Sequence, residues 1–368
     1  MSPLTTPDAP AVHDAPEPPV LVRREGAITR LTLNRPRALN AVNAEMFRLL
    51  RDALDVAQGD GSLAVLIDGA GERGLCGGGD IKELAAADPR EILALEYQLD
   101  YAISVSAVPV VVIMDGITMG GGIGLGGHAA HRIVTERSRL ALPEVRIGAV
   151  PDVGGHLLLA PIPGRLGEYL AVTAAEMSGA DAIAFGFADA LVRSTDLAGL
   201  RQALAAGASP ASVCARFATV APEAPLREVA DWWTPVAEAA LGSGTVTDDP
   251  VGAAARLLTA LERTEGEAAS ATAAAIRSAC PTSVAVTLAQ LERTRTHRLD
   301  LAGVLADDLR VFGRMGARPD FAEGVRAQVI DKDRTPRWSP AHIADLDPEA
   351  IARLLDPRPI AGELTLTL

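Results

Sequence analysis

The sequence contains few cysteines and few aromatic residues. Its three cysteines, Cys76, Cys214 and Cys280, are far apart in the 368 residues, odd in number, and without the spacing of metal ligands. We therefore expect no metal site and a reducing compartment, the cytoplasm. Aromatic residues make up 3% of the chain, so the core must consist mostly of Ala, Val, Leu and Ile.

Long apolar runs and an excess of basic residues are also missing. No apolar run approaches the roughly 18 residues that a membrane-spanning helix needs. The formal net charge is −13, with 34 Lys and Arg against 47 Asp and Glu. Because nucleic acids and anionic membranes bind clustered Lys and Arg, we expect neither as a partner. A local basic patch for a phosphorylated cofactor is still compatible with this charge.

The chain divides into an unstructured start, an ordered core and a long helical stretch. Residues 1–18 are Pro, Ala, Asp and Glu without periodicity, which predicts a disordered tail that is neither a signal nor a transit peptide. We expect a core over residues 19–195, which begins with a β-hairpin around Gly26 and a helix capped by Asn43. Residues 196–356 have helical spacing, and the alternating residues 357–368 suggest an edge strand.

A buried strand, a glycine-rich turn and a helix occur twice in the core. Residues 64–68 lead to the first turn, Gly77–Gly79, and to a helical segment that begins at Asp80. Residues 108–114, an apolar run without helical period, predict a strand buried on both faces and precede the glycine cluster 119–127. This alternation is typical of an α/β fold. The helix between the two units is marked by the spacing of Ile92, Leu95, Leu99 and Ile103.

The two glycine turns, taken together, predict a site that stabilises negative charge. If the two strands are neighbours in a sheet, the backbone N–H groups of Gly79 and Gly121 can converge on one oxygen atom and form an oxyanion hole. Such a hole suits attack on a thioester carbonyl or its enolisation. The simpler interpretation is that the glycines only permit tight turns. Cys76 lies beside the first turn, but no base accompanies it in the sequence.

Two carboxylates follow the second turn within one short segment. Glu144 and Asp152 are each flanked by proline and small residues that fix a turn. Close burial of two acids raises the pKa of one of them, which suits acid–base chemistry near neutral pH. The alternatives are that Glu144 forms a surface ion pair with Arg146 and that Asp152 caps a turn.

The same glycines also match a nucleotide-binding motif. Gly122, Gly124 and Gly127 match the G-x-G-x-x-G fingerprint after a strand. However, several residues separate the strand from the first glycine, and the chain before Ile133 is too short for a crossover helix. We therefore do not favour a nucleotide-dependent oxidoreductase.

The motifs resemble those of the crotonase, or enoyl-CoA hydratase/isomerase, superfamily in order and spacing. This resemblance implies an α/β fold, with a crotonase-like ββα-spiral core and a C-terminal helical region. Within the superfamily, the 3-hydroxyisobutyryl-CoA hydrolase group is the closer match, which extends the resemblance over most of the chain. The matching segments are 34–41, 77–82, 114–122, 143–148, 151–155 and 320–338.

The resemblance implies which residues carry the chemistry. Gly79 and Gly121 would form the oxyanion hole, and Glu144 and Asp152 would carry the acid–base work. A hydratase of the superfamily uses two glutamates, but the second falls on Gly124 here. Asp152 stands where hydratases usually have glycine and is the mark of the hydrolase group. The resemblance therefore implies C–S cleavage of a short 3-hydroxyacyl-CoA rather than C=C hydration.

The resemblance also implies how the substrate is held and how the chain assembles. Coenzyme A is part of the substrate, so no separate cofactor is expected. The superfamily favours trimers and pairs of trimers, which makes a homo-oligomer one option here, yet the extra helices of the hydrolase group can cover the same surface. Two alternative functions stay open, an enoyl-CoA hydratase/isomerase and an acyl-CoA-binding protein without turnover. The residues expected to contact substrate or coenzyme A are Arg37, Ala38, Leu39, Asp80, Ile81 and Gly120.

His156 follows the Asp152 turn at a position where the hydrolase group more often has a small residue. It could re-tune the choice of acyl group, although a single histidine is more often simply packed in the core.

Overall fold

The computed structural model describes residues 17–86, 88–242 and 246–368. The predicted disordered tail therefore lies outside the described residues except for Glu17 and Pro18. No helix in these three ranges has the length and apolar character to cross a membrane.

Within the described residues the strands form two sheets. The main sheet has the order β1-β2-β3-β5-β7-β10-β11 and is parallel from β2 to β10. Strands β1 and β2 form the predicted hairpin, and β11 pairs antiparallel with β10 at the other edge. The bounds are β1 Val20–Glu25, β2 Ile28–Leu33, β3 Ala64–Gly69, β5 Val110–Met114, β7 His131–Val134, β10 Ala190–Val192 and β11 Ala218–Thr219.

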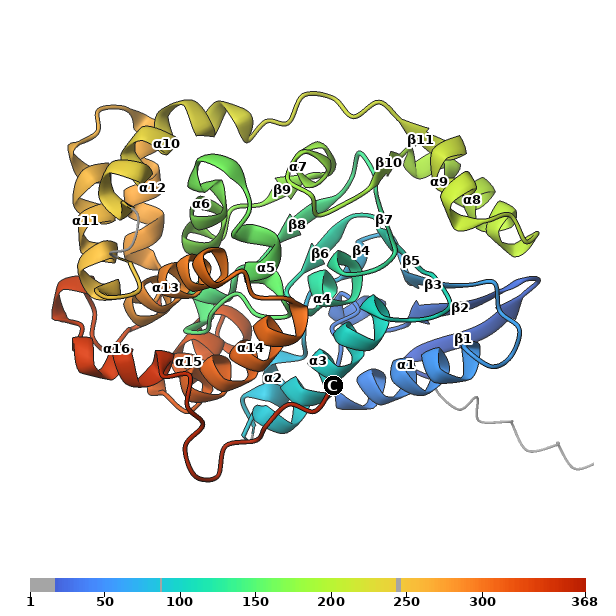
Figure 1. Ribbon diagram of the computed structural model, residues 1–368, viewed down its shortest axis with the longest axis horizontal. Coiled ribbons are helices and arrows are strands. Elements are labelled where there is room, and N and C mark those ends of the chain that lie inside the picture. Colours follow the sequence, from blue (N-terminus) through green and yellow to red (C-terminus); the bar gives the residue numbers. More distant parts are fainter. Residues whose placement is uncertain (1–16, 87, 243–245) are drawn as a thin grey trace, which may run out of the picture.

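A smaller sheet lies beside the main one and has the order β4-β6-β8-β9. Strands β4, β6 and β8 run parallel, and β9 is antiparallel to β8. Successive strands of the chain alternate between the two sheets from β3 to β8, with helices after them, so the core winds as a ββα spiral (Figure 1). The bounds are β4 Gly74–Cys76, β6 Ile117–Met119, β8 Arg139–Ala141 and β9 Met177–Ser178.

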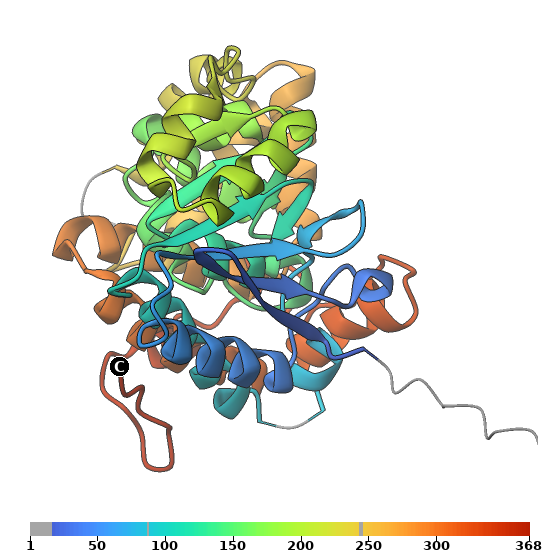
Figure 2. The same ribbon diagram turned by 90° about the vertical axis from the view of Figure 1, so that its right-hand side faces the viewer.

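The central strands β3 and β5 of the main sheet are buried on both faces, as their sequence predicts. Val110 and Val112 of β5 pack into the large core that includes α1, whereas Val111 and Ile113 face a second apolar cluster formed with α8 and α9. Figure 2 shows these helices on opposite sides of the sheet. Asn43 caps α1 as expected, because its side chain accepts a hydrogen bond from the Met46 amide at 3.0 Å.

Seven helices of the core surround the two sheets in the part of the chain that the structure describes. Their bounds are α1 Ala44–Ala57, α2 Ile81–Leu84, α3 Arg90–Ser104, α4 Gly121–Gly127, α5 Gly155–Leu159, α6 Leu166–Thr173 and α7 Gly179–Ala184.

The second half of the chain is helical, as its spacing predicts. Helices α10 to α16 gather at one side of the molecule, where they share the large apolar core with α3 and α6 (Figure 1). The prediction of an edge strand over residues 357–368 is wrong, because none of these residues forms a strand. The bounds are α8 Leu197–Ala205, α9 Pro210–Phe217, α10 Arg227–Leu241, α11 Pro250–Arg263, α12 Glu267–Ser278, α13 Pro281–His297, α14 Leu301–Gly316, α15 Pro319–Val325 and α16 Pro348–Leu355.

Candidate active site

Three parallel strands of the smaller sheet bring the predicted site residues to one edge. Strand β4 ends at the turn with Gly79, β6 at the turn with Gly121, and β8 shortly before Glu144. The sequence led us to expect that the longer strands 64–68 and 108–114 would place the two turns. In the structure the short strands β4 and β6, which the sequence analysis missed, do so.

The two glycine turns touch each other and leave backbone donors free. The Gly79 nitrogen lies 3.3 Å from the position that a Cβ on Gly121 would occupy. Among the described residues, neither the Gly79 amide nor the Gly121 amide donates a hydrogen bond. Gly120 has φ of +49°, and a Cβ there would lie 3.1 Å from Oε1 of Glu144. A larger side chain in either turn would therefore obstruct the space between them.

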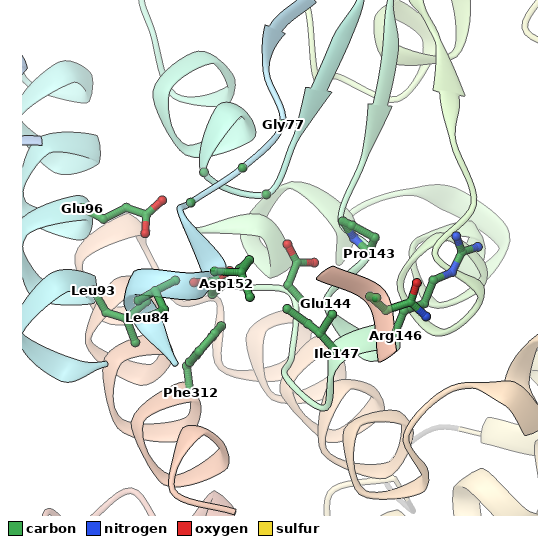
Figure 3. A pocket seen from close by; sticks show the side chains of 16 residues that line it. Gly77, Leu84, Leu93, Glu96, Pro143, Glu144, Arg146, Ile147, Asp152 and Phe312 are labelled. Atoms are coloured by element: carbon green, nitrogen blue, oxygen red, sulfur yellow. The ribbon is translucent and has the colours of Figure 1, made fainter. Parts of the chain in front are cut away.

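A cavity that is partly open to solvent adjoins the two turns, and its empty space is about 820 Å³ when the solvent at its open mouth is included. Figure 3 shows Glu96 and Glu144 on opposite sides of the glycine turns. The lining residues are Gly77, Gly78, Gly79, Ile81, Leu84, Leu93, Glu96, Gly120, Gly121, Pro143, Glu144, Arg146, Ile147, Asp152, Phe312 and Gln328.

Of the six residues predicted to contact substrate or coenzyme A, two line this cavity and four do not. Ile81 and Gly120 belong to its wall, whereas Arg37, Ala38, Leu39 and Asp80 lie outside it. Arg37 and Ala38 are exposed. The Leu39 carbonyl accepts the Gly77 amide at 2.8 Å and so supports the first turn. The Asp80 carboxylate pairs with Arg35 at 3.0 Å.

Glu144 is buried at the cavity without a charged partner. Its Oε2 atom has no hydrogen-bond partner within the described ranges. The expected alternative, an ion pair with Arg146, is absent among the described ion pairs, because that guanidinium donates to the carbonyls of Thr173 and Ala174 at 3.1 and 3.2 Å. Figure 3 shows Arg146 pointing away from Glu144. Burial and the charge of Asp152 raise the pKa of Glu144 well above its ordinary value.

Asp152 faces the same cavity and is held by a tyrosine. Its Oδ2 atom accepts a hydrogen bond of 2.6 Å from the hydroxyl of Tyr97 on α3. Burial and the charge of Asp308 raise the pKa of Asp152 to about 7, against the Tyr97 hydrogen bond, which lowers it. The side chain therefore does not cap a turn, and it sits in a setting suited to proton transfer near neutral pH.

The sequence analysis missed three polar residues of α3. Glu96 lines the cavity, Tyr97 binds Asp152, and Asp100 lies behind Glu96 with neither carboxyl oxygen bonded in the described chain. Burial, with nearby carboxylates adding to it, raises the pKa of Glu96 and of Asp100 well above the ordinary values. A signal was available, because Glu96 and Asp100 fall within the apolar stripe of a predicted helix.

The distant 320–338 segment also reaches the cavity. Gln328, in a π-helical turn at Arg326–Ile330, lines its wall. Phe321 packs edge-on against Phe312 of α14, with ring centroids 5.7 Å apart, and Phe312 faces the cavity. Cys76 is fully buried, and burial raises the pKa of its thiol to about 12, so it is not an activated nucleophile.

These features define a protein of the crotonase class, with two glycine turns from parallel strands and acids at their ends. Comparison with known families agrees, because residues 28–355 match the family described as enoyl-CoA hydratase/isomerase. The chain belongs to this family.

Two curated relatives carry the same name. The chain is 35% identical to 3-hydroxyisobutyryl-CoA hydrolase, mitochondrial, of Rattus norvegicus over 343 residues, covering 90% of this chain and 86% of that protein. The human protein of the same name is 32% identical with the same coverage.

Solved structures with the same fold are named otherwise. A carnitinyl-CoA dehydratase from Mycobacterium thermoresistibile is 36% identical, with a TM-score of 0.85, and the match covers 95% of this chain and 98% of that one. An enoyl-CoA hydratase from Rhodobacter sphaeroides is 37% identical, with a TM-score of 0.83 and coverage of 95% and 100%. The crotonase fold with a helical C-terminal region is thus confirmed.

Proposed function

We propose that the protein hydrolyses a short 3-hydroxyacyl-CoA thioester, 3-hydroxyisobutyryl-CoA first among them, to the free acid and coenzyme A. The observation that carries this proposal is the pair of unbonded amides of Gly79 and Gly121 beside two buried acids, Glu144 and Asp152. The relatives named as hydrolases support the proposal, since this chain matches each of them over most of its length. If 3-hydroxyisobutyryl-CoA is the substrate, the reaction belongs to valine degradation.

The reaction we propose begins with the thioester carbonyl bound between the Gly79 and Gly121 N–H groups. Negative charge that develops on the carbonyl oxygen is stabilised by these two donors. Ionised Glu144 then acts on the carbonyl carbon, either by direct attack to give a mixed anhydride or by taking a proton from a water that attacks. The C–S bond breaks, the thiolate of coenzyme A takes a proton, and water supplies the new oxygen of the acid.

Asp152 serves the same reaction in one of two ways. It either hydrogen-bonds the 3-hydroxyl of the substrate or carries the proton to the leaving sulfur and from the water. The two roles predict different results with isobutyryl-CoA, which lacks the 3-hydroxyl. If Asp152 binds the hydroxyl, Asp152→Ala removes the preference for the 3-hydroxyacyl ester, since alanine offers the hydroxyl no hydrogen bond. If it carries the proton, both esters lose rate alike.

Hydration of an enoyl-CoA is the second candidate, because two solved relatives carry dehydratase and hydratase names. The absence of a carboxylate at position 124 counts against it. A Cβ on Gly124 would lie 2.5 Å from Oδ2 of Asp100, so this position leaves no room for a glutamate unless Asp100 moves. An acyl-CoA-binding protein without turnover is a further alternative, against which the two intact acids count.

We also propose that Arg37, Ala38, Leu39, Asp80 and Ile81 hold coenzyme A. Of these, Ile81 lines the cavity, and the exposed Arg37 side chain offers a permanent cation to a phosphate. The homo-oligomer, trimer or hexamer, and the cytoplasmic location stay predictions; the curated relatives are named mitochondrial.

The proposal is tested by thiol release, followed with a thiol-reactive dye, from 3-hydroxyisobutyryl-CoA, 3-hydroxypropionyl-CoA and crotonyl-CoA. The wild type is compared with Glu144→Gln and Asp152→Asn. We expect release from a 3-hydroxyacyl ester that both substitutions abolish. Release from none of the esters would overturn the proposal. Loss of crotonyl-CoA absorbance without free thiol would then identify a hydratase, and binding alone a non-catalytic protein.

A further inference from the structure

His156 is buried behind the Asp152 turn and connects two helices to it. Its Nδ1 atom lies 2.6 Å from the Thr294 hydroxyl on α13, and its Nε2 atom lies 2.7 Å from Oδ1 of Asp308 on α14. The other carboxylate oxygen of Asp308 accepts the Gly154 amide at 2.9 Å. A continuous chain of hydrogen bonds therefore runs from α13 through His156 and Asp308 to the backbone two residues beyond Asp152.

The turn that receives this bond has a backbone that needs support. Val153 has φ of +53° and Gly154 has φ of +73°, and a β-branched residue is rare in the left-handed region. On the other side of the turn, His128 contacts the Val153 carbonyl through Nε2 at 2.9 Å. Two histidines thus hold one turn, but only His156 does so through a carboxylate.

The charges around His156 do not balance without it. Asp307, the neighbour of Asp308 on α14, forms ion pairs with Arg293 and Arg310. Asp308 is fully buried, and within the described residues its ion pair is with His156 alone. A neutral imidazole would leave the Asp308 carboxylate uncompensated beside a site that already holds several acids.

The other titratable groups near the turn add no compensating cation. Helix α3 presents Tyr97, Glu96 and Asp100, and the loops present Asp152 itself and Glu144. On α13, the positive charge of Arg293 lowers the pKa of His156, but the Arg293 guanidinium forms its ion pair with Asp307. His156 is therefore placed to offset negative charge that would otherwise oppose ionisation of Asp152.

We propose that His156 is a positioning residue of the site, which as an imidazolium neutralises Asp308 while Asp308 holds the turn, and so lowers the cost of ionising Asp152. The inference rests on the proposed hydrolysis and names a residue that tunes it. An imidazolium donates from both ring nitrogens, which matches the Asp308 carboxylate and the Thr294 hydroxyl as acceptors.

The electrostatic balance agrees with this geometry. Burial alone lowers the pKa of His156, but the charge and hydrogen bond of Asp308 raise it above the ordinary value. For Asp152, burial and Asp308 raise the pKa, whereas the charge of His156 lowers it. By contrast, burial lowers the pKa of His128 to about 4, so this second histidine is neutral at the same turn.

The charge state of His156 is measured directly by ¹⁵N NMR of histidine-labelled protein. The sequence has six histidines, and the signal that disappears in His156→Gln is assigned to His156. We expect the shifts of a doubly protonated ring at pH 7.5. A neutral tautomer at that pH would overturn the proposal. This measurement needs no substrate, so it stands whether or not the hydrolysis proposal holds.

The effect on the site is measured from the pH dependence of kcat/KM for thiol release. His156→Gln keeps an amide N–H within reach of Asp308 but removes the positive charge. One limb of the pH–rate profile reports the ionisation of Asp152, and we expect this limb to move to higher pH by about one unit. The double variant His156→Gln with Asp308→Asn removes both charges and should return the limb to the wild-type position. A purely structural role would lower the rate in both variants without this reversal.

His128→Gln is the matched control, because it alters a neutral histidine at the same turn. Its limb should stay in place. If His156→Gln does not fold, Thr294→Val replaces it: loss of the Nδ1 acceptor should shift the limb in the same direction by less. An unshifted limb in His156→Gln, or a double variant no closer to the wild type, would contradict the proposal. No thiol release from the wild type would instead refute the proposed function, leaving the NMR result to judge His156.

Discussion

Two groups of buried acids in this protein have opposite surroundings. Glu168 of α6 and Glu292 of α13 share the guanidinium groups of Arg165 and Arg295, with ion pairs of 2.7 to 3.2 Å. At the cavity and next to it, Glu96, Asp100, Glu144 and Asp152 enter no ion pair among the described residues. Unbonded carboxylate oxygens do not separate the two groups, because Glu168 has one as well as Glu96, Asp100 and Glu144.

The comparison shows that burial alone does not distinguish a structural acid from a reactive one. The first group joins two helices, and each of its carboxylates is compensated where it lies. The second group lacks compensation, so the pKa values of its members rise above the ordinary range. Acids of this second kind at the wall of a cavity are candidates for proton transfer.

Among the changes that keep Glu144, the largest effect is expected for Asp152→Asn, which removes a proton carrier but keeps the shape. Thiol release from the 3-hydroxyacyl ester should fall by about 10²- to 10⁴-fold, the usual loss for a general acid or base. The Tyr97 hydroxyl can still donate to the asparagine oxygen, so the midpoint of thermal unfolding should change little. A rate within threefold of the wild type would remove Asp152 from the mechanism.

Glu168→Gln tests the other side of the comparison. The change leaves Arg165 and Arg295 with only Glu292, so we expect a loss of about 2 to 3 kcal/mol in the free energy of unfolding. Urea unfolding followed by circular dichroism measures this loss. Stability equal to that of the wild type would show that the charge cluster does not hold α6 against α13.

Asp100→Asn should have a smaller effect on the free energy of unfolding. This effect should be a gain rather than a loss, and it should depend on pH. A carboxyl with a higher pKa in the folded state keeps a proton there that the unfolded chain loses above its ordinary pKa near 4. Wild-type stability therefore falls as pH rises from there, by at most about 1.4 kcal/mol per pH unit for this group. The variant should gain on the wild type between pH 5 and pH 8 in urea unfolding. A constant difference would contradict the assignment of a neutral Asp100.

Tyr97→Phe should have the smallest effect. The Tyr97 hydrogen bond lowers the pKa of Asp152, so its loss should move the Asp152 limb of the pH–rate profile upward by less than one unit. Tyr101→Phe, on the same helix and away from the cavity, is the control and should leave the profile in place. A downward shift in Tyr97→Phe would contradict the proposed hydrogen bond.

Local signals in the sequence were sufficient for much of the fold and part of the site. Valine-rich runs predicted the strands of the main sheet, and the resemblance placed Gly79, Gly121, Glu144 and Asp152, which the structure brings to one cavity. The short strands β4 and β6 were missed, because three residues carry no periodicity.

What the sequence could not supply are partners distant along the chain. Tyr97 meets Asp152 across 55 residues, and His156 meets Asp308 across 152. No spacing rule connects such residues, because tertiary packing alone sets their distance. The strand predicted from the alternating C-terminal residues was wrong for the same reason, since a strand needs a neighbouring strand with which to pair.

The central claim is that the uncompensated acids perform chemistry whereas the compensated acids hold the fold. It is tested most directly by the initial rate of thiol release per folded molecule for Glu144→Gln beside Glu168→Gln. The account predicts that Glu144→Gln loses at least about 10³-fold in rate without losing stability, as expected for an essential group acting on the carbonyl. It also predicts that Glu168→Gln keeps its rate within about threefold while losing stability. Retained activity in Glu144→Gln, or an equal fall in both variants, would contradict the account.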